Sequence, residues 1–433
     1  MTAQDSTTGS PGTTAVTRRA ALGGLAVLTL INLLNYLDRY VLAALLPQIK
    51  SSGLSLSDFE LGTLMTGFII VYLLAAPLFG SLGDRGRRPR LVAIGVTLWS
   101  LATAASGLAR SYLQLFSARA AVGVGEAAYG TIAPALLADY FPRGSRGRAF
   151  AVFYMAIPVG SALGYVFGGL AAQAWGWRTA FLLAGLPGLA LAVCLRRLVD
   201  PPRGVQEPGL AAAPAAGGVA ATWALYRALL RRAPYTLTVL GYAAYTFAMG
   251  GLAFWMPTFL MRARGLPAAQ ATTTFGVVVV VTGFLGTFAG GWLGDLWQKR
   301  SQQAYLWLCG VVTLLAVPVA AVALMAAARA VYYPALIVAE LLLFMSTGPV
   351  NSAIVNLVAP AQRASAVGLS VFAIHALGDV LSPSLIGALS DHWSLGVAVL
   401  VVPVAVAISG LLWLAAAAAA RGAPAADARP ATR

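Results

Sequence analysis

Long apolar runs dominate the chain, and short stretches rich in charge, glycine or proline separate them. A helix needs about 20 apolar residues to cross a hydrocarbon core of roughly 30 Å. The pattern therefore predicts twelve membrane-spanning helices, six on each side of a proline- and alanine-rich stretch. The predicted spans are 20–47, 58–82, 91–109, 112–140, 147–173, 179–199, 235–260, 269–294, 303–327, 331–358, 364–390 and 395–420.

This pattern predicts an all-α polytopic membrane protein with two pseudo-symmetric six-helix halves. GSLGD at 80–84 recurs as GWLGD at 291–295, and parallel repeats of this kind place a substrate site between the halves near mid-membrane. We expect a short surface helix near 221–232. The predicted parts are a disordered cytoplasmic N-terminus (1–19), an N-terminal bundle (20–199), a cytoplasmic linker (200–233), a C-terminal bundle (234–420) and a cytoplasmic tail (421–433).

Composition supports a membrane protein and argues against several other classes. Hydrophobic residues make up 59% of the chain and charged residues 10%, whereas soluble domains have about 25% charged residues. Unbroken apolar runs exclude a β-barrel, which alternates apolar and polar positions. No phosphate-binding G-x-x-x-x-G-K-[ST] stretch is present, which argues against ATP-driven transport. A membrane sensor or scaffold would carry a sizeable soluble domain, and the longest predicted loop is only the linker.

The net charge of +15 suggests a nucleic-acid partner, but its distribution argues against one. Of the 29 Lys and Arg residues, two lie within spans, six lie in loops on one side and 21 on the other, which is the positive-inside pattern. We therefore expect both termini in the cytoplasm and a multi-pass protein of the plasma (cytoplasmic or inner) membrane. The apolar run after Arg18 and Arg19 is too long for a twin-arginine export signal.

The stretch NYLDRY at 35–40 places an acid and a base near the middle of the first span. A charge at that depth costs at least ~2.5–3.5 kcal/mol, so such residues face a bundle interior or a wet cavity. Arg119 and Glu126 are seven residues apart on the fourth span and share one helix face. Asp38, Arg39, Arg119 and Glu126 thus form one candidate constellation.

Two interpretations of this constellation remain open. It is either a structural buried salt bridge or a protonatable carboxylate beside a fixed arginine. Burial raises the pKa of a carboxylate and a nearby arginine lowers it, so protonation can switch the pairing. The two cysteines, Cys194 and Cys309, and the two histidines, His375 and His392, lie in no cluster that suggests a metal site, and we expect no cofactor.

The turn GSLGDRGRRPR at 80–90 is a candidate cytoplasmic gate, because an acid followed by arginines can latch two helices together. Simple topology anchoring is the alternative, although it requires neither the glycine nor the acid, nor the copy in the second half. The candidate gate residues are Gly80, Asp84, Arg85, Arg88 and Asp295.

This turn resembles the loop 2–3 motif of the major facilitator superfamily, although Arg87 stands where that motif has its second glycine. WGWRTAF at 175–181 also resembles the superfamily's loop 5–6. Three further stretches are similar to the Spinster family, namely INLLNYLDR at 31–39, GVGEAAYGTIAP at 123–134 and FYMAIPVGSALGY at 153–165. The resemblance implies movement of sphingosine phosphate or lysophospholipids with proton coupling, and it implies that Asp38, Arg119 and Glu126 are coupling residues.

Polar and aromatic side chains in both halves are candidates for the substrate site. Aromatic residues of the seventh span either face lipid or line an amphipathic cavity, and His375 and Asp379 are i,i+4 neighbours that can pair. The candidate substrate-binding residues are Asn35, Tyr36, Tyr129, Tyr154, Tyr242, Tyr245, Glu340, Asn351, His375 and Asp379. Gly160, Gly164 and Gly168 form a close-packing stripe on span five, for which we predict a contact between the halves.

The sequence thus predicts a secondary transporter that works by alternating access and draws its energy from a proton gradient. Its predicted partners are membrane lipids and an amphipathic small-molecule or lipid substrate, with no nucleic acid, and we expect a monomer. A proton-coupled multidrug or organic-ion transporter of the same superfamily is the alternative.

Overall fold

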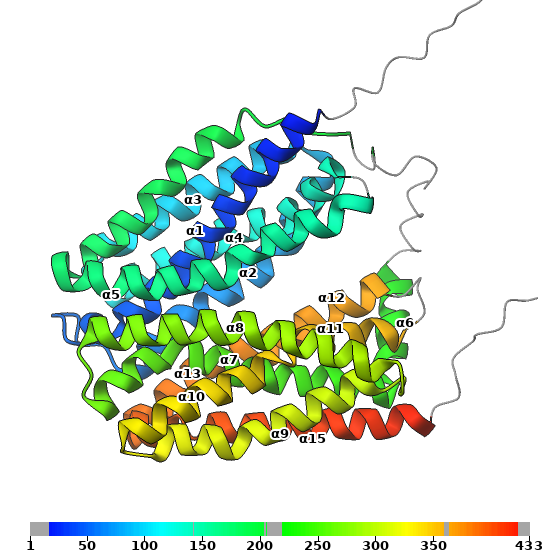
Figure 1. Ribbon diagram of the computed structural model, residues 1–433. Coiled ribbons are helices and arrows are strands. Elements are labelled where there is room, and N and C mark those ends of the chain that lie inside the picture. Colours follow the sequence, from blue (N-terminus) through cyan, green and yellow to red (C-terminus); the bar gives the residue numbers. More distant parts are fainter. Residues whose placement is uncertain (1–16, 142, 203–204, 206–218, 359–362, 423–433) are drawn as a thin grey trace, which may run out of the picture.

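A computed structural model describes residues 17–141, 143–202, 205, 219–358 and 363–422, and every regular element within them is a helix. Eleven helical stretches in these residues are long and apolar enough to cross a membrane. One of them, Val152–Leu195, has 44 residues. Its helix breaks at Gly176 (φ 82°, ψ 160°), where the ribbon reverses direction (Figure 1). This stretch therefore holds two crossings, which agrees with the predicted twelve-helix fold.

Helices α1–α5 pack mainly on one another and are called the N-terminal half below, whereas α7–α15 form the C-terminal half. The N-terminal half contains α1 (Arg18–Lys50), α2 (Asp58–Arg85), α3 (Arg88–Leu108), α4 (Tyr112–Tyr140) and α5 (Arg143–Leu195). The C-terminal half contains α7 (Ala233–Arg264), α8 (Ala268–Gln298), α9 (Ala304–Met325), α10 (Arg329–Phe344), α11 (Thr347–Asn356), α12 (Arg363–Ile374), η2 (His375–Asp379), α13 (Ser382–His392), α14 (Leu395–Ala398) and α15 (Val401–Gly422).

Three of the predicted spans in the C-terminal half are not continuous α-helices. The span predicted at 331–358 divides into α10 and α11, where Pro349 in the first turn of α11 supplies no backbone N–H. The span predicted at 364–390 contains the π-helical turn η2 between α12 and α13. A short α14 precedes α15 in the last span. The sequence pattern did not reveal these breaks, although the first falls at Ser346 and Thr347 and the second holds His375 and Asp379.

The two halves lie as two layers in Figure 1, in contact through the pairs α5–α8, α2–α13 and α1–α7. The start of α1, helix α6 (Val219–Leu230) and the end of α15 lie at one end, which we call the linker end. The opposite end, called the far end, carries the turn at 51–57 and the left-handed Gly265 that ends α7. The layers are close at the far end and diverge toward the linker end.

Several helices begin at a residue whose side chain caps the first turn. Ser57 accepts a hydrogen bond from the Glu60 amide while the Glu60 carboxylate accepts one from the Ser57 amide, so the capping box of α2 is complete. Thr17 and Ser111 cap α1 and α4 in the same position. Since each cap satisfies amide groups that the helix leaves free, these residues fix where the helices start.

The glycine stripe of α5 packs within the N-terminal half, so the prediction that it forms a contact between the halves was wrong. A Cβ atom at Gly160 or Gly164 would overlap the backbone of α1 at Leu33 or Leu37. The close approach of α1 and α5 therefore depends on these positions. A different face of α5 meets the C-terminal half, where the Tyr165 hydroxyl donates a hydrogen bond to the Ala253 carbonyl.

Several predictions lie partly or wholly outside the described residues. They concern the disorder of the N-terminus (1–16 of the predicted 1–19), much of the linker (203–204 and 206–218) and the tail beyond residue 422. The side chains of Asp84 and Arg85 are also outside the described set. The predicted surface helix is α6, which presents an exposed Trp223 and buries Leu229.

Candidate functional site

Two ion pairs join α1 to α4 inside the N-terminal half. The Asp38 Oδ2 atom lies 3.2 Å from Arg119 Nη1, and the Glu126 Oε2 atom lies 2.7 Å from Arg39 Nε. The side chains of Arg119 and Glu126 are fully buried, and Asp38 is 2% exposed. The structure therefore brings together all four residues of the predicted constellation, and three of them are almost completely buried.

These ion pairs leave several buried atoms without a partner in the described part of the chain. They are Asp38 Oδ1, Glu126 Oε1, and Arg119 Nε and Nη2. A fully satisfied structural salt bridge would have hydrogen bonds at most of these atoms, because an unpaired buried polar group costs free energy. The network thus has the capacity to bind a proton or a polar ligand.

Arg39 is the most accessible member of the network, with 21% of its side chain exposed. Its guanidinium carbon lies 5.2 Å from the ring centre of Tyr36, 5.1 Å from Phe68 and 5.5 Å from Tyr72. Rings at these distances attract a cation. They hold the guanidinium beside Glu126, where it covers the buried carboxylate.

The other predicted substrate residues of the N-terminal half lie in different environments. Tyr129 is 2% exposed, donates a hydrogen bond to the Leu28 carbonyl (2.8 Å) and packs on Trp99, so it supports the core. Asn35 is buried, and its amide nitrogen has no partner among the described residues. Tyr154 is 47% exposed beside Phe153. Tyr36 is the predicted substrate residue that contacts the ion pairs directly, through Arg39.

A cavity of about 290 Å³ lies mainly within the C-terminal half. Four predicted substrate residues line it, namely Tyr242, Tyr245, Glu340 and Asp379. Tyr40 of α1 also lines it, so the cavity opens between the halves. The remaining lining residues are Thr246, Met249, Gly250, Ala253, Phe275, Val279, Phe344, Thr347 and Ile374.

The predicted pair of His375 and Asp379 is confirmed, with Nδ1 lying 3.0 Å from the carboxylate. This pair forms in the π-helical turn, and Asp379 borders the cavity. Asn351 donates a hydrogen bond to the Tyr242 hydroxyl at 3.3 Å from an exposed position. His375 and Asn351 are not among the described lining residues, but each contacts one of them, Asp379 and Tyr242 respectively.

The candidate gate residues at the linker end form contacts within one half. Arg88 is 3% exposed and lies 2.5 Å from Asp139 and 2.8 Å from Asp200, which ties the start of α3 to the end of α4 and to the chain after α5. Asp295 accepts a hydrogen bond from Tyr305 at 2.7 Å. A Cβ at Gly80 would meet nothing within 4 Å. In this conformation these described residues do not latch the two halves.

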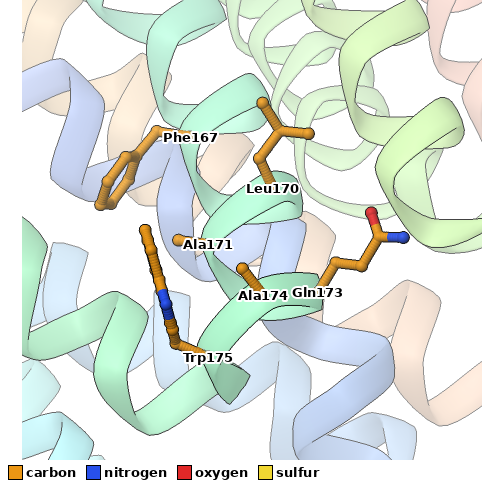
Figure 2. A pocket seen from close by; sticks show the side chains of 6 residues that line it. All are labelled: Phe167, Leu170, Ala171, Gln173, Ala174 and Trp175. Atoms are coloured by element: carbon orange, nitrogen blue, oxygen red, sulfur yellow. The ribbon is translucent and has the colours of Figure 1, made fainter.

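A second hollow, of about 640 Å³, lies along the end of α5 that leads to the Gly176 turn. Figure 2 shows Phe167, Leu170 and Trp175 around it, together with the amide side chain of Gln173. None of the ion-paired residues is among its described lining residues.

Sequence reasoning missed two groups of residues. Tyr40 and Phe275 were not predicted to line a site, although Tyr40 directly follows the charged pair on α1. A polar cluster at the far end was also missed, in which Asp58 contacts Lys50, Arg262 and Ser390. Lys50 is eight residues from Asp58, but Arg262 and Ser390 are 204 and 332 residues away, so spacing alone gives no signal for the cluster.

Residues 28–382 match the sequence profile of the Major Facilitator Superfamily. Spinster homolog 3 of Danio rerio is 36% identical over 406 residues, which cover 89% of this chain and 80% of that protein. Spinster homolog 1 of Homo sapiens is 36% identical and covers 85% of this chain and 72% of its own length. This chain belongs to the spinster family of the Major Facilitator Superfamily. This spinster protein is a membrane transporter and not an enzyme.

Solved structures support the same fold. A bacterial homologue of the human lysosomal transporter Spinster, in an inward-facing and unoccupied conformation, superposes with a TM-score of 0.85, is 24% identical and covers 93% of this chain and 98% of its own. The inward-facing and occupied form of that homologue gives a TM-score of 0.77 at 24% identity, covering 92% of this chain and 96% of its own. The nucleoside transporter NupG gives 0.72 at 11% identity, covering 91% and 98%.

Proposed function

We propose that this spinster protein is a proton-coupled secondary transporter of an amphipathic lipid, such as a lysophospholipid or a sphingoid phosphate. The observation that carries the proposal is the buried network of Asp38, Arg39, Arg119 and Glu126, in which each carboxylate has one paired oxygen and one oxygen without a partner among the described residues. Two acids and two bases inside a membrane bundle are costly unless they serve a function. A proton-driven transporter needs carboxylates that can exchange an arginine partner for a proton.

Glu126 is the group through which protonation would change the site most directly. A proton on Glu126 cancels the charge that holds Arg39 at 2.7 Å. Arg39 would then present its guanidinium toward the exposed side of the network, where a phosphate can form bidentate hydrogen bonds with it. Protonation of the carboxylate and capture of an anionic headgroup would thus be linked through one side chain.

In an alternating-access cycle, a change of conformation would let a proton reach Asp38. Asp38 is 2% exposed in this conformation, so its protonation requires a rearrangement that opens the N-terminal half to water. The halves are joined by Asp58 and Arg262 at the far end and diverge toward the linker end.

The orientation in the membrane follows from charge. The linker end carries the excess of Lys and Arg, so we place both termini in the cytoplasm and the far end outside, in a plasma (cytoplasmic or inner) membrane. The segments Gly80–Arg88 and Asp295 would then form the cytoplasmic gate. We further propose that the protein acts as a monomer, with 20–199 and 234–420 as its two moving bundles joined by the linker 200–233.

A proteoliposome flux assay tests this function. The purified protein would be reconstituted with a pH gradient, and uptake of labelled lysophospholipid would be compared between the original protein, Asp38→Asn and Glu126→Gln. We expect both variants to insert normally and to lose uptake driven by the gradient. Unchanged gradient-driven uptake in both variants would refute the coupling role.

A proton-coupled transporter of organic cations is the second candidate. The observation in its favour is the cavity lining, whose described residues include Glu340 and Asp379 but neither lysine nor arginine. A panel of lysolipids and organic cations in a thermal-shift assay separates the two candidates. Stabilisation by cations without an acyl chain, and none by lysolipids, would favour the second.

A further inference from the structure

Glu340 is a buried acid for which the described residues provide no counter-charge. Its side chain lies on α10 and is 2% exposed. The Oε2 atom has no hydrogen-bond partner in the described part of the chain, and no ion pair joins Glu340 to a described Lys, Arg or His. A buried carboxylate without a partner is destabilising, so a partner that arrives with the ligand would relieve this cost.

The walls around Glu340 are aromatic. Tyr40, Tyr242, Tyr245, Phe275 and Phe344 line the same cavity as Glu340. The Tyr245 hydroxyl donates to the Leu343 carbonyl at 2.9 Å, which fixes its ring. The Tyr40 ring packs against Tyr165 with centres 5.0 Å apart. Fixed aromatic rings beside a carboxylate are the arrangement that recognises an ammonium group, because ring faces attract a cation.

The charge of the cavity favours a cation over an anion. Its two carboxylates are Glu340 and Asp379, and Asp379 is already paired with His375 at 3.0 Å. No lysine or arginine is among the described residues that line it. The cavity volume of about 290 Å³ is near the lower bound of small-molecule sites, roughly 300–1,000 Å³. A compact headgroup suits this space better than an acyl chain does.

We propose that this cavity binds an organic ammonium group, with Glu340 as its counter-charge. Tyr40 lines the cavity, and Arg39 belongs to the ion-paired network. Because these are consecutive residues of α1, the cavity adjoins the network. A zwitterionic headgroup would place its ammonium beside Glu340 and its phosphate toward Arg39. The choice of a zwitterionic lysolipid as substrate rests on the proposed function, whereas ammonium binding at Glu340 does not.

Binding of choline to the purified protein in maltoside micelles tests the site directly. Isothermal titration would compare choline with 3,3-dimethylbutan-1-ol, which has the same shape without the charge. We expect choline to bind at least about tenfold more tightly, and Glu340→Gln to lower choline affinity by about tenfold or more, a change of ~1.4 kcal/mol. Equal binding of the two probes, no choline binding, or unchanged affinity in Glu340→Gln would overturn the proposal.

Two further variants separate a local effect from misfolding. Glu340→Asp keeps the charge, so we expect it to retain part of the choline affinity that Glu340→Gln loses. Glu60→Gln is the matched control, because Glu60 lies in the capping box of α2 and glutamine can make the same cap. It should bind choline as the original protein does. If Glu340→Asp binds no better than Glu340→Gln, the negative charge is not the recognising feature and the proposal is wrong.

A flux comparison then distinguishes this inference from the proposed function. Lysophosphatidylcholine and lysophosphatidylglycerol of equal acyl length would be offered to proteoliposomes. We expect faster flux of the choline lipid in the original protein and equal flux in Glu340→Gln. Equal flux of both lipids in the original protein would overturn the inference and leave the proposed function intact. If neither lipid moves, the lipid function fails, and the choline titration alone decides the ammonium site.

Discussion

Asp58 of α2 and Arg262 of α7 join the two halves at the far end, with the Oδ2 atom 2.6 Å from Nη1. The Asp58 carboxylate also meets Lys50 at 2.6 Å and accepts a hydrogen bond from Ser390 of α13. In return, Asp391 of α13 accepts hydrogen bonds from the first amides of α2, at Asp58 and Phe59. Each half thus supplies an acid that the other half satisfies, and this closes the far end.

Neutralising Asp58 should open the far end. Breaking a buried pair by removing one partner costs about 3–5 kcal/mol, and here much of that cost falls on the conformation that contains the pair. We expect Asp58→Asn to shift the population toward a state in which the far ends of the halves separate. Spin labels at Phe59 and Trp393, both exposed, would report a longer distance by electron paramagnetic resonance.

Arg262→Gln should have the same effect as Asp58→Asn, and Arg264→Gln provides the matched control. Arg264 lies two residues further along and donates to the Leu324 carbonyl at 2.5 Å within its own half. Arg264→Gln should therefore leave the distance between the spin labels at Phe59 and Trp393 unchanged. If Arg262→Gln and Arg264→Gln give the same distance distribution, the ion pair does not close the far end.

The pair of Asp38 and Arg119 permits a test of structural against functional roles. Removing one member leaves the other charge buried and unpaired, so Asp38→Asn or Arg119→Gln alone should lower the melting temperature in micelles. The double variant removes both charges and should recover most of that loss, since replacing a whole buried pair by neutral groups is often nearly neutral.

Transport should respond differently from stability in this cycle. If Asp38 is a coupling residue, the double variant folds well but still fails to respond to a pH gradient in proteoliposomes. A purely structural salt bridge predicts that pH-driven uptake recovers along with the melting temperature. Measuring both quantities on the same four proteins therefore decides between the two interpretations.

Close packing of α5 on α1 gives a prediction about stability. A Cβ at Gly164 would lie 2.9 Å from Tyr40 Cβ and would overlap the Leu37 carbonyl. Gly164→Leu should therefore force the helices apart and destabilise the N-terminal half by about 1–3 kcal/mol or more, the usual cost of overpacking. The melting temperature in micelles measures this effect.

Gly23→Ala is the control for the glycine prediction. Gly23 lies on α1, where an added Cβ atom would meet nothing within 4 Å, and alanine favours a helix over glycine by about 0.8–1.0 kcal/mol. Its melting temperature should be unchanged or slightly higher. A similar loss of stability in both variants would show that helix packing at Gly164 is not the cause.

Residues close in sequence made much of this structure predictable. Apolar run lengths give the membrane helices, and the Ser57–Glu60 spacing gives the capping box of α2. The i,i+4 spacing of His375 and Asp379 gives their pair, even though the backbone there is π-helical. The seven-residue spacing of Arg119 and Glu126 places both on the face of α4 that meets α1. These relationships depend on helix geometry alone.

Relationships between distant elements were less accessible. The glycines of α5 indicated close packing, but only the three-dimensional arrangement shows that α1 is the partner. Arg88 was predicted to latch two helices, but its place in the sequence did not identify Asp139 and Asp200 as its partners. Tyr40 lines a cavity made mostly by residues more than 200 positions away. A single sequence does not reveal which apolar face meets which, because lipid and protein partners select the same residue types.

Arg88 leads to the last prediction, which concerns the linker end. Its guanidinium is buried between two carboxylates and also donates to the Pro201 carbonyl at 2.6 Å. Arg88→Ala removes the cation that pairs with Asp200, and removing one partner of a buried ion pair costs about 3–5 kcal/mol. The melting temperature of Arg88→Ala should therefore fall clearly, whereas Arg90→Ala, at an exposed position on the same turn, should fall little. Since the described contacts of Arg88 stay within the N-terminal half, the label distance at the far end should not change. A lengthened far-end distance in Arg88→Ala would show instead that this residue couples the two ends of the transporter.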